Sequence, residues 1–168
     1  MPTPAYLKII GVTQGLISSG ALARESVGNA WQQGREDEIL VQALSHGIVV
    51  PGGAQSGQRM HKPLIITKVI DKSSPLINTA LCTGEELTLC EVKWYRTSGS
   101  ATQEHFYTMR LKRAVIIGVD LSMPHCQNME TAHFTQLETV HFAYESITWQ
   151  HEIAGTSGWD IWQGELLG

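Results

Sequence analysis

Residues 93–114, KWYRTSGSATQEHFYTMRLKRA, decide the fold that the sequence predicts. Two runs of alternating side chains flank a polar turn, and this period of two predicts a β-hairpin. The leading strand carries two opposite faces: Cys90, Val92 and Trp94 against Glu91, Lys93 and Tyr95. The returning strand does the same: Tyr107, Met109 and Leu111 against Phe106, Thr108, Arg110 and Lys112. Such a hairpin could be the wall of a ligand cavity, the floor of an active site or a building block of a larger assembly.

The rest of the chain predicts further strands. We expect them, from β-branched or alternating apolar runs, over residues 6–10, 39–50, 64–70, 87–96, 104–119 and 136–150. The last of these has two faces: Val140, Phe142 and Tyr144 against Ala143, Ile147 and Trp149. Residues 15–30 are rich in Gly, Ser and Ala and predict irregular or edge structure. The whole predicts a mainly β fold: an antiparallel β-barrel with one short α-helix packed alongside and an extended loop.

The one helix that the sequence predicts covers residues 74–83. Ser74 is a good N-cap, because its hydroxyl can accept a backbone N–H, and Pro75 suits the first helical position. Gly84 can take the left-handed conformation that ends a helix. An apolar face at helical spacing is formed by Ile77, Ala80 and Leu81. So short a helix must pack on a sheet to be stable.

The chain length fits a single domain over residues 1–168. We expect the barrel in residues 1–150 and a C-terminal tail in residues 151–168 that orders only on contact. Residues 51–63 hold three glycines and two prolines and predict the extended loop. Several strands carry large apolar residues on both faces, which predicts that the helix or another subunit covers the outer face.

The charge, the apolar runs and the cysteine count of the chain argue against several classes of function. The formal net charge of −4 does not favour nucleic-acid binding, which uses a basic patch. No apolar run approaches the roughly 18 residues that span a bilayer, so we expect no membrane insertion. The N-terminus lacks the features of a signal peptide, so we expect synthesis in the cytoplasm. The odd count of three cysteines fits a reduced compartment, and we expect Cys82 and Cys90 to behave as small buried hydrophobes.

We predict no catalytic, cofactor-binding or metal-binding residues. His125, Cys126 and His133 lie close together, but their spacing matches no zinc site. A nucleophile pair of Cys126 with a distant histidine has no local motif to support it. The glycine-rich stretches match no phosphate-binding or dinucleotide-binding fingerprint. The run GREDE, residues 34–38, is either a solvated turn or a charged contact with a partner subunit.

A series of short motifs runs along nearly the whole chain. It reads YLKIIGVTQGLISSGA, SVGN, EDEILVQ, SGQRMHKPL, KWYRT with QEHFYT, MPHCQ, and FTQLETVHFAYESITWQHEIAGTSGWD. In their combined order these motifs resemble the haemolysin-coregulated protein (Hcp) family, the inner-tube subunit of the bacterial type VI secretion system. Arg35 departs from the family, because many relatives have histidine there in a GHEDE-type run.

The resemblance implies a β-barrel with one helix beside it, six copies in a ring, and rings stacked into a hollow tube. A contracting sheath would export the tube, tipped by a spike, from the cytoplasm to the outside without a signal peptide. Small effector proteins would travel in the lumen. The resemblance implies that the extended loop contacts neighbouring subunits through Gly52, Gly53, Gln55, Ser56, Gly57 and Arg59. We expect the charges of Glu36, Asp37 and Glu38 to set the register of stacked rings.

Two other functions stay open. A monomeric β-barrel could bind a small apolar ligand if its interior were unfilled. Bulky inward candidates argue for a filled interior: Val92, Trp94, Met109, Leu111, Phe142 and Tyr144. A Cys/His hydrolase is the third hypothesis, and a thiol-blocking reagent would abolish its activity.

Overall fold

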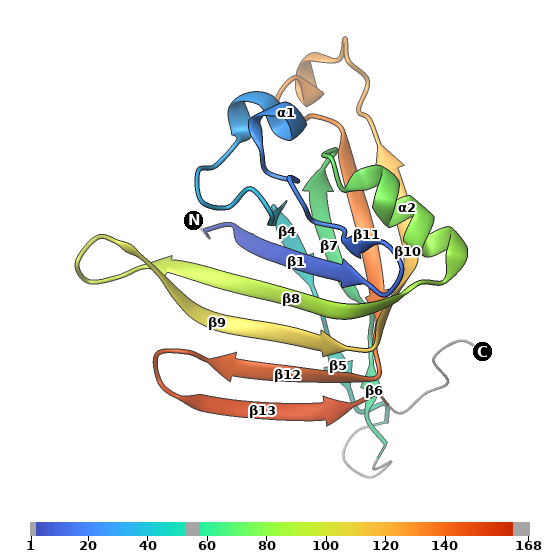
Figure 1. The fold of residues 1–168 in the computed structure, drawn as a ribbon, viewed down its shortest axis with the longest axis vertical. Helices are drawn as coiled ribbons and strands as arrows, with labels where there is room; N and C mark the ends of the chain where they lie inside the picture. The colour runs from blue at the N-terminus through green and yellow to red at the C-terminus, as the bar shows by residue number, and fades with distance from the viewer. Residues whose placement is uncertain (1–2, 53–57, 163–168) are drawn as a thin grey trace.

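A strongly curled antiparallel sheet forms the body of the protein (Figure 1). The computed structural model describes residues 3–52 and 58–162 of the 168-residue chain. The strands are β1 (Ala5–Gly11), β2 (Gly15–Leu16), β3 (Ile39–Val41), β4 (Ala43–Ser45), β5 (Ile48–Val49), β6 (Met60–His61), β7 (Leu64–Val69), β8 (Glu86–Thr97), β9 (Gln103–Lys112), β10 (Ala114–Ser122), β11 (Leu137–Ala143), β12 (Ser146–His151) and β13 (Thr156–Ile161). The helical elements are α1 (Arg24–Val27), η1 (Gly28–Ala30), α2 (Ser74–Thr83) and η2 (Met129–Thr131). The predicted fold class is confirmed.

Strand pairing runs most of the way around the core, and the chain itself links the two ends, β3 and β4, at Gln42. β1 pairs with β8 on one side and with β3 on the other. The chain then passes from β3 to β4, which pairs with β7. Gln42 lies between β3 and β4, and its backbone N–H bonds to the carbonyl of Thr67 in β7. β7 pairs with β11, β11 with β10, and β10 returns to β8 at Ala114 and Val115. The single strand predicted over residues 39–50 is wrong, because the chain changes partners at Gln42.

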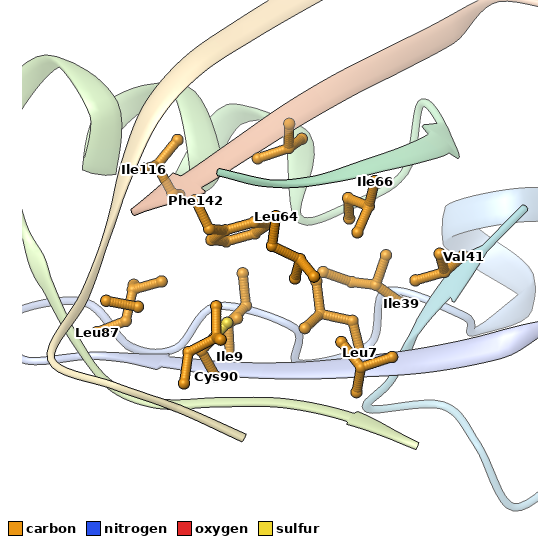
Figure 2. Close-up of a cluster of buried hydrophobic side chains, with 14 of the residues drawn as sticks. Leu7, Ile9, Ile39, Val41, Leu64, Ile66, Leu87, Cys90, Ile116 and Phe142 are labelled. Carbon is orange, nitrogen blue, oxygen red and sulfur yellow. The ribbon is translucent and has the colours of Figure 1, made fainter. Parts of the chain in front are cut away.

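The inward faces of these strands build one apolar core (Figure 2). Leu7 and Ile9 of β1, Ile66 of β7 and Phe142 of β11 are fully buried in it. Each such side chain contributes about 1.5–3 kcal/mol by leaving water. The predicted inward residues take part as expected, with Trp94 at the edge and five inside: Val92, Met109, Leu111, Phe142 and Tyr144. The barrel is therefore filled by its own side chains.

The β8–β9 hairpin has the two faces that its sequence predicts. Its core-side pairs across the strands are Cys90 with Leu111, Val92 with Met109 and Trp94 with Tyr107. Glu91 and Arg110 pair on the opposite face. β12 then pairs with β9, and β13 pairs with β12, so the sheet continues beyond the hairpin. We call β9, β12 and β13 the wing; in Figure 1 it lies below β8.

Two long predicted strands are broken by bends. The strand predicted over residues 104–119 is wrong, because Arg113 takes a left-handed backbone conformation, φ 50°, between β9 and β10. The strand predicted over residues 136–150 is broken between β11 and β12, at Tyr144 and Glu145. Ile147 consequently joins the same core as the β11 side chains, and its predicted place on the opposite face is wrong.

Helix α2 has the predicted extent and packs its predicted apolar face on the core: Ile77, Ala80 and Leu81. Gly84 ends it with φ 67°, as predicted. The predicted N-cap is wrong, because Ser74 is the first helical residue and its hydroxyl points inward. That hydroxyl accepts a hydrogen bond from Lys68 Nζ at 3.0 Å and donates to Glu138 at 2.8 Å. Lys68 is fully buried and pairs with both Glu138 and Asp71, which fastens α2 to the sheet.

Residues 15–30, predicted as irregular or edge structure, and part of the predicted C-terminal tail both hold regular structure. Residues 15–30 contain β2, α1 and η1. Residues 156–161 form β13, which is paired along its whole length, so the expectation that they order only on contact is wrong. Cys90 is buried as predicted, whereas Cys82 is exposed on α2. In the part of the chain that the structure describes, no helix is long and apolar enough to cross a membrane.

Candidate interaction surfaces

The residues predicted to contact other subunits lie in two separate regions. The GREDE loop, residues 34–38, lies near α1 and the start of β1, in the upper part of Figure 1. Gly52 and Arg59 belong to the connection between β5 and β6, two strands that lie at the lower end of the same view. Gly53, Gln55, Ser56 and Gly57 fall outside the described residues. The fold therefore does not bring the two regions together within one chain.

Arg35 fastens the GREDE loop to the sheet. Its guanidinium lies between the rings of Tyr6 and Tyr95, 4.0 Å from each centroid. It also lies 3.5 Å from the carboxylate of Glu38. A cation stacked on aromatic rings contributes about 0.5–1 kcal/mol where water has access. Arg35, which differs from the histidine of the GHEDE-type run, thus helps to attach the GREDE loop to the sheet.

The acidic residues of the loop also bond within the chain. Oδ1 of Asp37 accepts a hydrogen bond from the backbone of Gly20, and Oε1 of Glu36 accepts one from Gly34, both at 3.0 Å. Asp37 is exposed, and Glu36 and Glu38 are half-buried. These bonds hold the carboxylates at the surface, where their charge can act on a neighbouring molecule.

A second polar cluster holds the base of the β5–β6 hairpin. The Tyr144 hydroxyl lies 2.7 Å from Nε2 of His46 and 2.7 Å from Nδ1 of His61. Nε2 of His61 lies 2.7 Å from Oδ2 of Asp160. Arg59 donates to both oxygens of that carboxylate, from Nε and from Nη2. We call the following residues the Tyr144 cluster: His46, Arg59, His61, Tyr144, Asp160 and Trp162.

Trp162 covers this cluster from the end of β13. Its ring stacks on His61 at 6.0 Å between centroids and meets Tyr144 edge-on at 4.9 Å. Its backbone N–H bonds to the carbonyl of Glu145 at 2.8 Å. The C-terminal strand and the hairpin base are therefore joined by aromatic packing as well as by hydrogen bonds.

The protonation of the cluster follows from these contacts. The hydrogen bonds from Arg59 hold the pKa of Asp160 at about 2, so this carboxylate is ionised in ordinary buffers. Burial raises the pKa of Tyr144, which stays a neutral phenol. Burial, and secondly the nearby His61, lower the pKa of His46 below 6.5. At neutral pH the ionised pair is Arg59 with Asp160.

The family of the chain follows from comparison with known proteins. Residues 6–151 match a family described as "Type VI secretion system effector, Hcp". The chain belongs to the Hcp family. It is 51% identical over 172 residues to the "Major exported protein" of Pseudomonas aeruginosa, and the match covers 100% of both chains. The family that the sequence motifs predict is confirmed, and with it a role in type VI secretion.

Solved Hcp structures share the fold. A crystal structure of an Hcp protein superposes with a TM-score of 0.89 at 45% identity, covering 96% of this chain and 98% of that one. The secreted protein Hcp3 from Pseudomonas aeruginosa superposes with a TM-score of 0.84 at 48% identity. The match covers 96% of this chain and 99% of that one. The curled sheet with its helix is thus the Hcp fold over nearly the whole chain.

The filled interior of this Hcp chain argues against the ligand-binding hypothesis. Phe142 and its neighbours fill the barrel (Figure 2). An apolar pocket of about 660 Å³ lies at the edge of the core, lined by Pro4, Val41, Leu44 and Trp94 among others. In the described ranges, no three His, Cys, Asp or Glu side chains gather as metal ligands would.

Sequence reasoning missed most of the Tyr144 cluster. The sequence predicts Arg59 as a subunit contact and Tyr144 as an inward core residue, but it does not predict that the two belong to one cluster with histidines. The one local signal is that His46 and His61 stand on either side of residues 51–60. Tyr144 and Asp160 offer no signal of their own, because their partners lie 83 to 101 residues away in the sequence.

Proposed function

We propose that six copies of this chain form a ring, that rings stack into the hollow inner tube of the type VI apparatus, and that sheath contraction exports the tube. Its partners are further copies of itself, the sheath, the spike and small effectors carried in the lumen. It acts as a structural carrier, not as an enzyme, and uses no cofactor. Support comes from family membership over residues 6–151 and from a relative named a major exported protein.

The wing carries the structural observation that supports assembly. Trp159 in β13 is 69% exposed, and Ile161 beside it is 44% exposed. β13 pairs with β12 on one edge, and no other described strand pairs with its second edge. An unpaired strand edge that bears large apolar side chains favours contact with another chain. We infer that a neighbouring subunit covers β13 in the ring.

A substitution in β13 tests the ring contact. Trp159→Asp should shift the mass of the purified protein from rings towards single chains, because it places a charge in the apolar contact. Met129→Asp is the matched control, since Met129 is 88% exposed on η2, outside the wing. Equal ring mass for both variants, by light scattering after size exclusion, would contradict this role of β13.

For contacts between stacked rings, we propose the GREDE loop and, on a separate part of the subunit, the extended loop that the sequence predicts, of which Gly52 and Arg59 are described. Their separation along the molecule supports this, because head-to-tail stacking needs two different surfaces. The charges of Glu36, Asp37 and Glu38 would set the register, and Gly52, Arg59 and the residues between them would meet the next ring.

The stacking contact is tested by charge reversal. Glu36→Lys combined with Asp37→Lys should shorten tubes seen by electron microscopy, while ring mass and thermal unfolding stay near those of the wild type. Glu130→Lys, at an exposed acid on η2, is the control. Tubes of wild-type length in the double variant would exclude the GREDE loop from stacking.

A further inference from the structure

The curled sheet has two end strands, each with a second edge that no other described strand pairs with. The path of paired strands runs from β13, through the rest of the wing and the barrel, to β4 (Figure 1). Among the described strands, β13 pairs only with β12, and β4 pairs only with β7. A free strand edge offers N–H and C=O groups to another chain unless something covers it. Each subunit therefore has two free edges, and different sequences form them.

The β13 edge carries an apolar anchor. Trp159 is 69% exposed, and its neighbours on the same face of the wing are polar. Thr148 pairs with Trp159, and Arg110 pairs with Thr148 and forms an ion pair with Glu91. Tryptophan surrounded by polar groups is typical of a contact anchor, because the polar rim keeps water away from the buried ring.

The β4 edge borders a hollow. We call the apolar pocket of about 660 Å³ the β4 pocket; its walls include Pro4 just before β1, Val41 of β3, Leu44 of β4 and Trp94 of β8. None of the residues that line it carries a charge. Pockets of about 300–1,000 Å³ hold small molecules, so one indole side chain fits in this volume. An apolar ring that enters it leaves water on both sides of the contact, which is favourable.

The anchor and the pocket match in kind but lie apart on the subunit. β12, β9 and β8 separate β13 from the Trp94 wall of the pocket, and Trp159 stays exposed in its own chain. In a ring, one surface of each copy meets a different surface of the next copy, and the contact repeats until the ring closes. A protruding side chain at one end of the sheet and a hollow at the other end satisfy this requirement.

We propose that β13 of one subunit docks beside β4 of the next, with Trp159 inserted in the next subunit's β4 pocket. This names the surface that covers β13, and it rests on the proposed ring. The contact covers the free edges of both end strands and the most exposed apolar side chain of the wing. Each copy inserts one Trp159 and receives another, so a closed ring leaves neither surface uncovered.

Cysteine cross-linking of the full chain tests this pairing. The exposed Cys82 and Cys126 are first replaced by serine. Ser157→Cys lies on the face of β13 that carries Trp159, and Ala43→Cys lies at an exposed residue that lines the pocket, so both apolar surfaces stay intact. A short bismaleimide should join the two new cysteines between chains and give a ladder of up to six chains on a denaturing gel.

The matched control combines Ser157→Cys with Ser122→Cys, because Ser122 is exposed at the end of β10 and does not line the pocket. This pair should give no ladder. Light scattering of the untreated samples measures ring mass separately. Rings without a ladder from the β13 and β4 cysteines would overturn the pairing, leave the ring standing and assign the pocket to another occupant. A wild-type chain that stays single at every concentration would refute the ring itself.

Mixing two blocked variants gives a second test that needs no cross-linker. Ala43→Arg places a cation at the pocket and Trp159→Asp removes the anchor, so each variant alone should give single chains. In an equal mixture, the intact β13 of the first variant can dock in the intact pocket of the second, and the mass should rise to two chains and no further. Rings of wild-type mass for Ala43→Arg alone, or a mixture that keeps the mass of one chain where the wild type forms rings, would overturn the proposal.

Discussion

The barrel core is buried and the Tyr144 cluster is partly buried, and different forces hold them. The core is made of aliphatic and aromatic side chains around Phe142, whose packing has little directional demand and no charge. In the cluster, one hydroxyl is placed between two histidines, and each contact depends on where a proton sits. The shape of the subunit therefore depends on apolar packing, whereas the attachment of its β5–β6 hairpin depends on protonation and so on pH.

The largest expected effect comes from a cavity in the core. Phe142→Ala should lower the free energy of unfolding by about 3–5 kcal/mol, because the lost contacts leave a void that the sheet cannot fill. Chemical denaturation of the purified chain measures this loss. Phe134→Ala is the control: its side chain is 61% exposed, and its change should stay within about 0.5 kcal/mol. Similar losses for both would contradict the filled barrel.

A smaller effect is expected from removing one hydroxyl. Tyr144→Phe should destabilise the chain by about 1–3 kcal/mol, because a ring nitrogen on each histidine loses its partner in a buried place. Tyr107→Phe, which removes a hydroxyl from a half-buried tyrosine on the wing, should change stability much less. A Tyr144→Phe variant as stable as the wild type would show that the cluster adds nothing to the fold.

The pH dependence of folding stability should distinguish the Tyr144 cluster from the barrel core. Folding lowers the pKa of His46, chiefly through burial, so the unfolded chain binds more protons than the folded one in mild acid. The contribution of His46 is therefore fully present above about pH 6.5 and is lost as the pH falls through its folded pKa. Denaturation midpoints at several pH values should fall in parallel for the wild type and Phe142→Ala, and less steeply for His46→Gln. Parallel curves for all three would refute the assignment to His46.

The smallest effect is expected at the GREDE loop. Arg35→Ala should lower stability by about 0.5–1 kcal/mol, because water competes for a guanidinium that stacks near the surface. Lys112→Ala, at an exposed cation on β9, should be close to neutral. A loss of several kcal/mol at Arg35 would mean that the loop belongs to the core structure.

Local periodicity was enough to predict what depends on neighbours in the sequence. The two faces of the β8–β9 hairpin and the extent of α2 follow from alternation, from Pro75 and from Gly84. The bend at Arg113 could not be predicted, because a non-glycine residue with positive φ has no signature in the sequence. The point at which β9 ends and β10 begins is therefore set by how these strands pair in the folded sheet and not by the local sequence.

The Tyr144 cluster lay beyond sequence reasoning for a related cause. His46, His61, Tyr144 and Asp160 come together only because the curled sheet places the hairpin beside the end of β13. No spacing rule applies to partners so far apart in the sequence. The predicted subunit contacts at Glu36, Asp37, Glu38, Gly52 and Arg59 stay predictions, and residues 53–57 lie outside the described part of the chain.

The most direct test of the central claim is the absolute mass of the purified wild-type chain by light scattering across a concentration series. The account predicts a mass of six chains, with whole multiples of it where rings stack. A single chain at every concentration would contradict the ring.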